Sequence, residues 1–282
     1  MDYFDLHCDT AYECYKSKQG ILNNNLAVCV EKGKGFDGWS QVFALWIKDD
    51  TPEPFLQYKK IINYFKEQLK SAENTNLQPL FALEGGAAAE TLYCLDEMKA
   101  DGIKSITLTW NEKNKIASGA NEEGGLTDYG EQVIEKMNDL KIATDLSHLN
   151  RESFFDAVSI AKYPIATHSN CYGVYAHKRN LTDAQLIKIA EKQGIIGVCP
   201  YPEFSGMDSF EGVLSNILYM RSLGLENNIA FGSDFDGAKM SANLSDVSKV
   251  KDLFVFLRKN GISYELCERI FYENAKDYFE KL

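Results

Sequence analysis

FDLHCDT, residues 4–10, places His7 and Asp9 two positions apart at the end of a run whose apolar residues are Phe4, Leu6 and Cys8. Such a run is typical of a buried β-strand, where residues two positions apart share a face and lie about 6.6 Å apart. His7 and Asp9 are therefore close enough to reach one metal ion. The pair alone does not establish a metal site, because a strand-end His that hydrogen-bonds a turn is the more common arrangement.

Seven further runs of this kind follow, and the segments between them show helical periodicity. Phe55, Tyr58 and Ile62, for example, recur at three- and four-residue steps. Strands that alternate with helices predict parallel strands joined by crossover helices. About eight units favour an α/β fold of the (β/α)8 TIM barrel type over a doubly wound sheet. The predicted strands are residues 3–7, 41–47, 79–83, 104–109, 141–146, 163–167, 194–199 and 228–232.

The remaining organisation of the chain predicts one catalytic domain over residues 1–282. No internal repeat, low-complexity tract or Pro- or Gly-rich linker interrupts the sequence, and residues 246–282 have the pattern of C-terminal helices. Thr127 and Thr182, each followed by an Asp, are predicted helix N-caps.

Composition limits the partners of the protein. The formal net charge is −11 and no run of Lys or Arg occurs, so a nucleic-acid partner is not expected. Seven scattered cysteines without a C-x-x-C pair predict reduced thiols and a cytoplasmic location. The first residues do not read as a secretion signal, and no stretch approaches the roughly 18 apolar residues of a membrane span, so no membrane partner is expected.

Polar side chains stand at the ends of the predicted strands, where a barrel builds its active site. Three of the four histidines lie there, and the fourth, His177, is interpreted as structural in a loop. Three His, one Asp and one Glu suit zinc. They exceed what one catalytic ion needs, whereas two ions about 3.5–4 Å apart that share a carboxylate would use them all and hold a bridging hydroxide. The strand-end residues are His7, Asp9, Glu84, Asp145, His148, His168 and Asp234.

Two of these acids have an alternative, structural interpretation. Glu84 could be a metal ligand. It is about equally consistent with a buried carboxylate that caps a helix starting at Gly85 and Gly86. Asp234 lies in GSDFDG, residues 232–237, where an Asp commonly forms a turn. The sequence leaves both alternatives open.

Seven segments carry a family resemblance, and in chain order they are FDLHCDT, FALEGG, ITLTWNEKN, GLTDYGEQVIEKMNDLKIATDLSHLN, PIATHSN, HKRNLTD and FGSDFDG. Together they resemble the membrane (renal) dipeptidase family of zinc peptidases, from the first strand to about Gly237. The resemblance implies a (β/α)8 barrel with a binuclear zinc site. It also implies the ligands: His7 and Asp9 bind one zinc, His148 and His168 bind the other, and Glu84 bridges them.

The resemblance further implies how a substrate is held. Arg179 matches the family arginine that pairs with the terminal carboxylate of the substrate, a task suited to a guanidinium. An exposed Arg at a helix start fits the local sequence as well. Asp234 matches an acid near the substrate amino group and the scissile bond, a candidate proton shuttle. Trp110 departs from the family, because the animal enzymes have there a His that contacts the tetrahedral oxygen. Trp has one N–H donor and no titratable group, so oxyanion stabilisation is expected to rest more on the metals.

These observations predict a zinc-dependent dipeptidase, a metallohydrolase with two zinc ions, in which Asp234 and Glu84 are catalytic and Arg179, Trp110 and Asp234 contact the substrate. A second hypothesis is hydrolysis of another amide, a β-lactam or a lactone by the same ions. A third is a binding protein that has lost catalysis and uses Trp110 to stack on its ligand. The resemblance also suggests a homodimer.

Overall fold

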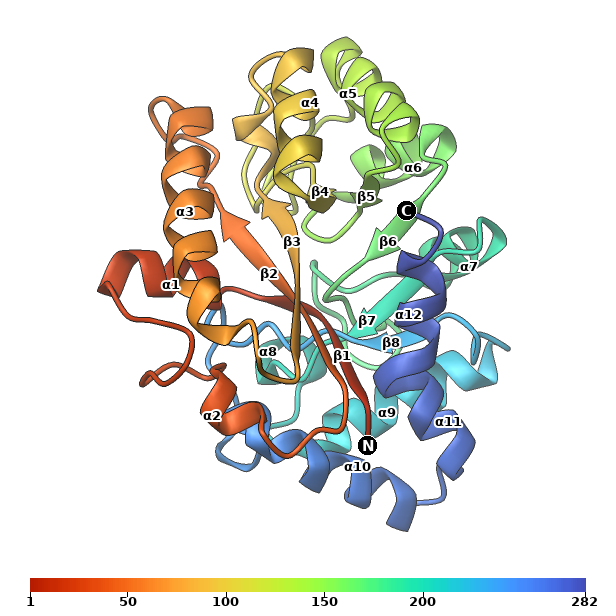
Figure 1. Cartoon of the computed structure of the whole chain (residues 1–282). Coiled ribbons are helices and arrows are strands. Elements are labelled where there is room, and N and C mark those ends of the chain that lie inside the picture. Colours follow the sequence, from red (N-terminus) through yellow and green to blue (C-terminus); the bar gives the residue numbers. More distant parts are fainter.

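Eight parallel strands surround a common axis in the computed structural model, which describes residues 1–282 (Figure 1). The strands follow chain order around the barrel, so the predicted (β/α)8 architecture is confirmed. The segment after β8 joins the end of β1 through two backbone hydrogen bonds, from Asp234 N to His7 O at 3.0 Å and from Asp9 N to Phe235 O at 2.8 Å. The strands are β1 (Tyr3–Cys8), β2 (Trp39–Trp46), β3 (Leu77–Glu84), β4 (Ile103–Thr107), β5 (Ala143–Asp145), β6 (Pro164–Ala166), β7 (Ile195–Val198) and β8 (Ile229–Phe231).

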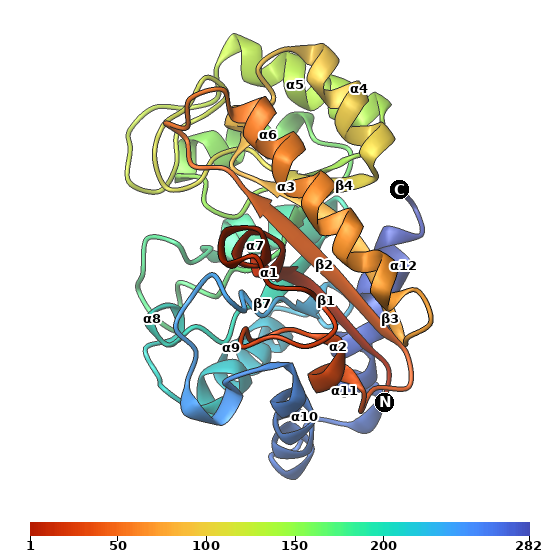
Figure 2. The ribbon, with the colours of Figure 1, turned by 60° about the vertical axis from the view of Figure 1, so that its left-hand side comes forward.

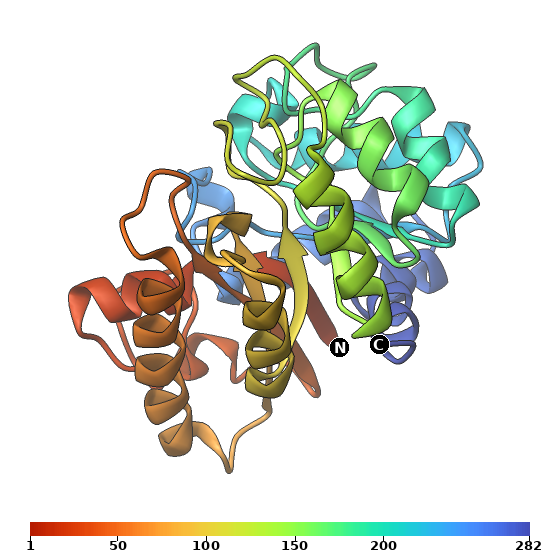
Figure 3. The same ribbon diagram turned by 90° about the horizontal axis from the view of Figure 1, so that it is seen from above.

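Helices lie outside the strands and connect them (Figures 1 and 3). The predicted cap at Thr127 is present, because its side chain accepts a hydrogen bond from Gly130 N at 2.9 Å. Thr182 also precedes its helix, and its backbone N–H donates to the Gln185 side chain at 3.0 Å. The helices up to β8 are α1 (Thr10–Ser17), α2 (Val30–Gly33), α3 (Pro54–Leu69), α4 (Leu92–Asp101), α5 (Asp128–Asp139), α6 (Arg151–Ile160), α7 (Asp183–Glu191), α8 (Pro202–Ser205) and α9 (Phe210–Ser222), with 3-10 turns at Lys70–Ala72 and Gly86–Ala88.

The tail after β8 is helical, as its pattern predicts. Phe279 in the last helix stacks on Phe4 of β1 at 5.2 Å, and the Tyr278 hydroxyl donates to Pro164 O at 3.1 Å. The last helix thus packs against the side chains inside the barrel. The elements are 3-10 turns at Ala242–Leu244 and Val247–Lys249, α10 (Val250–Lys259), α11 (Tyr264–Glu268), a π-helical turn at Arg269–Glu273, and α12 (Asn274–Phe279). None of the helices is both long and apolar enough to cross a membrane.

The strand register brings the ends of several strands to one level. β2 and β3 pair along their whole length, with α3 beside them (Figure 2), and Trp46 is opposite Glu84. Glu84 is in turn opposite Thr107, and Thr107 is opposite Asp145. Since all strands are parallel, these residues mark the carboxyl end of the barrel, where catalytic loops begin in this fold.

The backbone is crowded around the carbonyl of Thr167. A Cβ atom added to Gly197 would lie 1.9 Å from Thr167 O, and one added to Gly232 would lie 1.8 Å from it. Glycine is therefore required where β7 and β8 pass the loop after β6.

Replacement of Gly197 by Ala is expected to lower the free energy of unfolding by about 1–3 kcal/mol, the usual cost of overpacking a core. Urea unfolding followed by circular dichroism would measure the change. Gly20→Ala is the matched control, because its Cβ would meet only the end of the flexible Gln68 side chain, at 3.2 Å. Equal stability of the two variants would contradict the requirement for glycine at position 197.

Candidate active site

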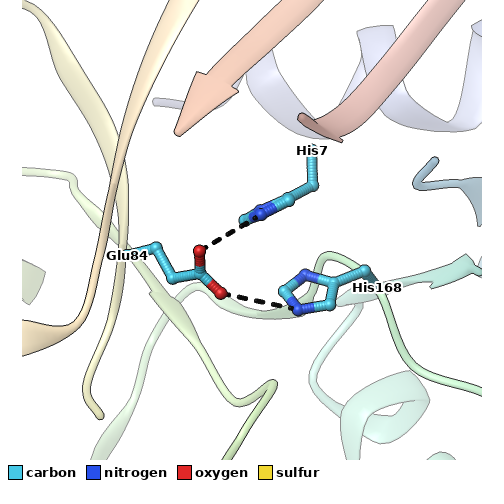
Figure 4. A group of neighbouring side chains, drawn as sticks. All are labelled: His7, Glu84 and His168. Carbon is cyan, nitrogen blue, oxygen red and sulfur yellow. Dashed lines mark ion pairs between the residues drawn. The ribbon is translucent and has the colours of Figure 1, made fainter. Parts of the chain in front are cut away.

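The five residues predicted as metal ligands lie together at the carboxyl end of the barrel. His7 belongs to β1, Glu84 ends β3, and the other three follow β1, β5 and β6. All are buried, with exposed fractions between 1% and 6%. Figure 4 shows the imidazoles of His7 and His168 pointing at the Glu84 carboxylate. The five residues are His7, Asp9, Glu84, His148 and His168.

Glu84 lies between two pairs of side chains. Its Oε2 is 3.5 Å from His7 Nε2, which is itself 3.4 Å from Asp9 Oδ2. Its Oε1 is 2.9 Å from His148 Nε2 and 3.7 Å from His168 Nε2. The two imidazole nitrogens of this second pair are 2.8 Å apart. Each carboxylate oxygen of Glu84 therefore faces a different group of donors.

Asp234 adds a third carboxylate beside the first pair, with its Oδ1 3.9 Å from His7 Nε2. Its φ is 58° and that of His148 is 70°, both in the left-handed region that non-glycine residues rarely adopt. Such a conformation costs of order 1–3 kcal/mol and is found mainly where the surrounding structure enforces it, often at functional sites.

The charge distribution of this cluster suits a bound cation. Burial, together with the negative charge of Glu84, raises the pKa of Asp9 well above its usual value. Burial raises the pKa of Asp234 to about 7. Both ring nitrogens of His7 are buried and have no hydrogen-bond partner. Crowded carboxylates and an unpartnered imidazole are the donor set that a borderline divalent metal neutralises and coordinates, so the residues present fit such an ion.

The structure bears on both alternatives that the sequence leaves open. Glu84 does not cap the 3-10 turn at Gly86–Ala88, which has no side-chain cap hydrogen bond, and its carboxylate faces the histidines instead. In the 232–237 loop the structural acid is Asp236, which accepts from Thr10 Oγ1 at 2.5 Å and from Ala27 N at 2.7 Å. Asp234 also begins a turn, because its carbonyl accepts from Gly237 N at 3.2 Å, but its side chain faces His7.

A cavity of about 590 Å³ opens above the cluster, and Asp9, Glu84, His148 and Asp234 line it. Arg179 also lines it. The interpretation of Arg179 as an exposed residue is wrong: it is only 6% exposed, and its Nε and Nη2 atoms are buried without a hydrogen-bond partner. A buried, unpaired guanidinium is costly unless an anion joins it.

Aromatic side chains from α1, from the end of β2 and from the loop after β4 form another part of the cavity wall. The ring of Trp46 contacts those of Trp110 and Tyr12 edge-on, with centroid distances of 5.4 Å and 5.0 Å. The Trp110 ring centroid lies 6.2 Å from that of His148, so Trp110 borders the group of candidate ligands. Trp46 ends β2, four strands around the barrel from β6, which precedes Arg179. Trp46 and Arg179 therefore come from opposite sides of the barrel.

Several cavity residues have no signal in the sequence. His177 lies in a loop, as predicted, but it also lines the cavity, where its Nδ1 accepts from Arg179 N at 3.2 Å. Tyr201 and Phe204 join it beyond β7. Asn111 contacts a candidate ligand directly, with its Oδ1 2.9 Å from His148 Nδ1. Its position next to Trp110 in the segment LTWN is the one hint that the sequence offers.

The chain matches known proteins in sequence. A sequence model of the membrane dipeptidase family (Peptidase family M19) matches residues 55–280. An uncharacterized protein in the pqqA 5′ region of Klebsiella pneumoniae is 33% identical over 196 residues, 64% of this chain and 72% of that protein. Dipeptidase aclJ of Aspergillus oryzae is 29% identical over 243 residues, 77% of this chain. This match spans only 57% of aclJ, and the match to dipeptidase tcpJ of Claviceps purpurea spans 42% of that relative.

Two solved structures share the fold. Dipeptidase AC, described as a metallopeptidase of family M19, superposes with a TM-score of 0.89 at 23% identity, over 99% of this chain and 98% of its own. A metallopeptidase from Rhodobacter sphaeroides, liganded with a phosphinate mimic of the dipeptide L-Ala-D-Ala, superposes with a TM-score of 0.89 at 22% identity, over 99% of each chain. With the family model matching most of its length, the chain belongs to the membrane dipeptidase family.

Proposed function

We propose that the chain is a metal-dependent dipeptidase that uses two zinc ions and forms one catalytic domain. The observation that carries this proposal is that one 590 Å³ cavity is shared by a cluster of metal-type ligands and a buried, unpaired guanidinium. A small substrate with a free carboxylate, cleaved beside the cluster, satisfies both. Family membership and the dipeptide mimic bound by the structurally similar Rhodobacter sphaeroides enzyme support it.

In this proposal the candidate ligands form two groups, according to the distances between their donor atoms. His7 and Asp9 would hold one ion and His148 and His168 the other, with one oxygen of Glu84 toward each. When bound, two such ions polarise a carbonyl and make water nucleophilic near neutral pH.

Arg179 determines the length of the substrate in this proposal. Its guanidinium has two free, buried nitrogens to donate to the terminal carboxylate, and bidentate donation is its strongest form of recognition. Because Arg179 and the ligands face one cavity, the peptide bond nearest the carboxylate is the one presented for cleavage. The proposal therefore takes as substrate a dipeptide, whose single peptide bond lies next to its terminal carboxylate.

Asp234 moves the proton. Its carboxyl group lies on the cavity wall beside His7. It accepts a proton that water loses on attack at the peptide carbonyl and returns it to the leaving amine, so that one carboxylate and one amine are formed. Trp110 has no titratable group and cannot share this task. It contributes to the aromatic wall.

Protein purified without chelator is expected to contain two equivalents of zinc and to hydrolyse members of a mixed library of L-L and L-D dipeptides. Plasma emission spectrometry and amine release would measure metal and turnover, with chelator-treated protein as the control. If dipeptides were not cleaved and a β-lactam or a lactone were, the second hypothesis, hydrolysis of another substrate by the same ions, would be supported instead. Absence of both bound metal and turnover would support the third hypothesis, a binding protein that has lost catalysis.

A further inference from the structure

The imidazole of His168 is held from behind by a short chain of buried side chains. Its Nδ1 is 2.9 Å from the hydroxyl of Thr167, and that hydroxyl is 2.6 Å from Asp145 Oδ2. Asp145 ends β5, and Thr167 directly follows β6. All three residues are essentially inaccessible to solvent, so water does not compete for these hydrogen bonds.

The direction of each hydrogen bond follows from what surrounds Asp145. Its Oδ1 accepts the backbone N–H groups of Ser147 at 3.0 Å and Thr167 at 3.1 Å. Its Oδ2 contacts the hydroxyls of Thr107 at 2.8 Å and Thr167 at 2.6 Å. A carboxylate only accepts, so both hydroxyls donate to it.

The proton position on His168 is then determined. A hydroxyl has a single hydrogen, and that of Thr167 is used by Asp145, so only an oxygen lone pair is left for His168. Nδ1 must therefore carry the imidazole hydrogen and donate it to Thr167. In a neutral imidazole the other nitrogen, Nε2, then carries the lone pair. This Nε2 faces His148 Nε2 at 2.8 Å and Glu84 Oε1 at 3.7 Å.

We propose that Asp145 and Thr167 are positioning residues that keep the Nε2 lone pair of His168 directed at the metal site. The proposal rests on the metal-dependent function proposed above. The crowding at Thr167 O by Gly197 and Gly232 supports it, because the backbone that carries the hydroxyl is confined on both sides.

The other two histidines are treated differently. His148 Nδ1 contacts the amide oxygen of Asn111 at 2.9 Å. The Asn111 side chain is not hydrogen-bonded to a charged group. His7 Nδ1 has no partner at all. His168 is thus the candidate ligand whose tautomer is set by a carboxylate, through one hydroxyl. Partners of this kind orient metal-binding imidazoles and raise their basicity.

The test compares two substitutions at the same oxygen of Asp145. Thr167→Val removes the hydroxyl that contacts both Asp145 and His168, whereas Thr107→Val removes one that contacts Asp145 only. In the metal-free protein, Thr167→Val is expected to raise the dissociation constant for Zn²⁺ about 10- to 100-fold. Thr107→Val is expected to leave it unchanged, and Thr167→Ser to restore it. Competition with a chromophoric chelator measures this binding without an activity assay.

A second readout follows the tautomer itself. The chain has four histidines, so their ring nitrogens can be assigned by nitrogen-15 NMR with the help of a His168→Gln spectrum. In the metal-free wild type, His168 is expected to carry its hydrogen on Nδ1, and Thr167→Val is expected to mix the two tautomers.

The proposal is overturned if His168 is protonated on Nε2 in the wild type, if Thr167→Val binds Zn²⁺ as the wild type does, or if Thr107→Val loses as much affinity. The wild-type spectrum decides the first point even if Thr167→Val does not fold. Weaker metal binding by Thr167→Val in a protein that cleaves no dipeptide would reject the proposed function and retain the positioning role.

Discussion

Glu84→Ala is expected to lose bound metal and dipeptide hydrolysis together. Glu84 is the one side chain whose two oxygens face both groups of donors, at 3.5 Å from His7 Nε2 and 2.9 Å from His148 Nε2. Its removal leaves each group one ligand short and removes the negative charge between them. Metal assistance is worth several kcal/mol, and each 1.4 kcal/mol or so is tenfold in rate, so kcat/KM should fall by about 1,000-fold or more.

Metal content and turnover should be measured on the same preparation of this variant. Glu90→Gln is a suitable control, because Glu90 is exposed and its carboxylate contacts only the backbone N–H of Phe55, at 3.3 Å. It should keep both metal and activity. Two bound ions with normal turnover in Glu84→Ala would reject the binuclear assignment.

Arg179→Met is expected to lose recognition of the substrate carboxylate while it keeps the metal. Methionine roughly preserves the apolar stem against Phe204, over which the guanidinium now lies at 5.2 Å, and removes the charge. Truncating one partner of a buried charged pair costs about 2–5 kcal/mol, so kcat/KM for a dipeptide should fall between about 30-fold and several thousand-fold.

A dipeptide amide makes this experiment specific. The wild type should strongly prefer the free dipeptide over its C-terminal amide, whereas Arg179→Met should cleave both equally poorly. Lys178→Met, which removes an exposed neighbouring charge at the same cavity, should retain the preference. If Lys178→Met behaved like Arg179→Met, a general positive field rather than the guanidinium would select the carboxylate.

All eight strands could be located from the sequence because parallel barrel strands are buried on both faces and are continuous apolar runs. The residues at which each strand begins and ends could not be located in this way. The run at 141–146 predicts six residues, but only Ala143–Asp145 pair as β5, and the run at 104–109 pairs as Ile103–Thr107. Pairing length depends on where neighbouring strands stay in register, which is a property of the closed barrel.

The candidate ligands could be found because each lies at a strand end, and parallel strands bring their ends to one edge. Arg179 could not be placed in this way. Its segment predicts an exposed helix start as readily as a buried anchor, and only its position in the cavity shows the guanidinium to be buried.

The sequence by itself determined the barrel, the order of its strands and the identity of the side chains that converge on His7, because apolar periodicity and strand-end chemistry are local properties. Only the tertiary structure decided how those side chains are used. The contact of Asn111 with His148 and that of Asp145 with Thr167 join residues 37 and 22 positions apart. Hydrogen bonds require alignment within a few tenths of an ångström, which no pattern of residue types specifies before the chain has folded.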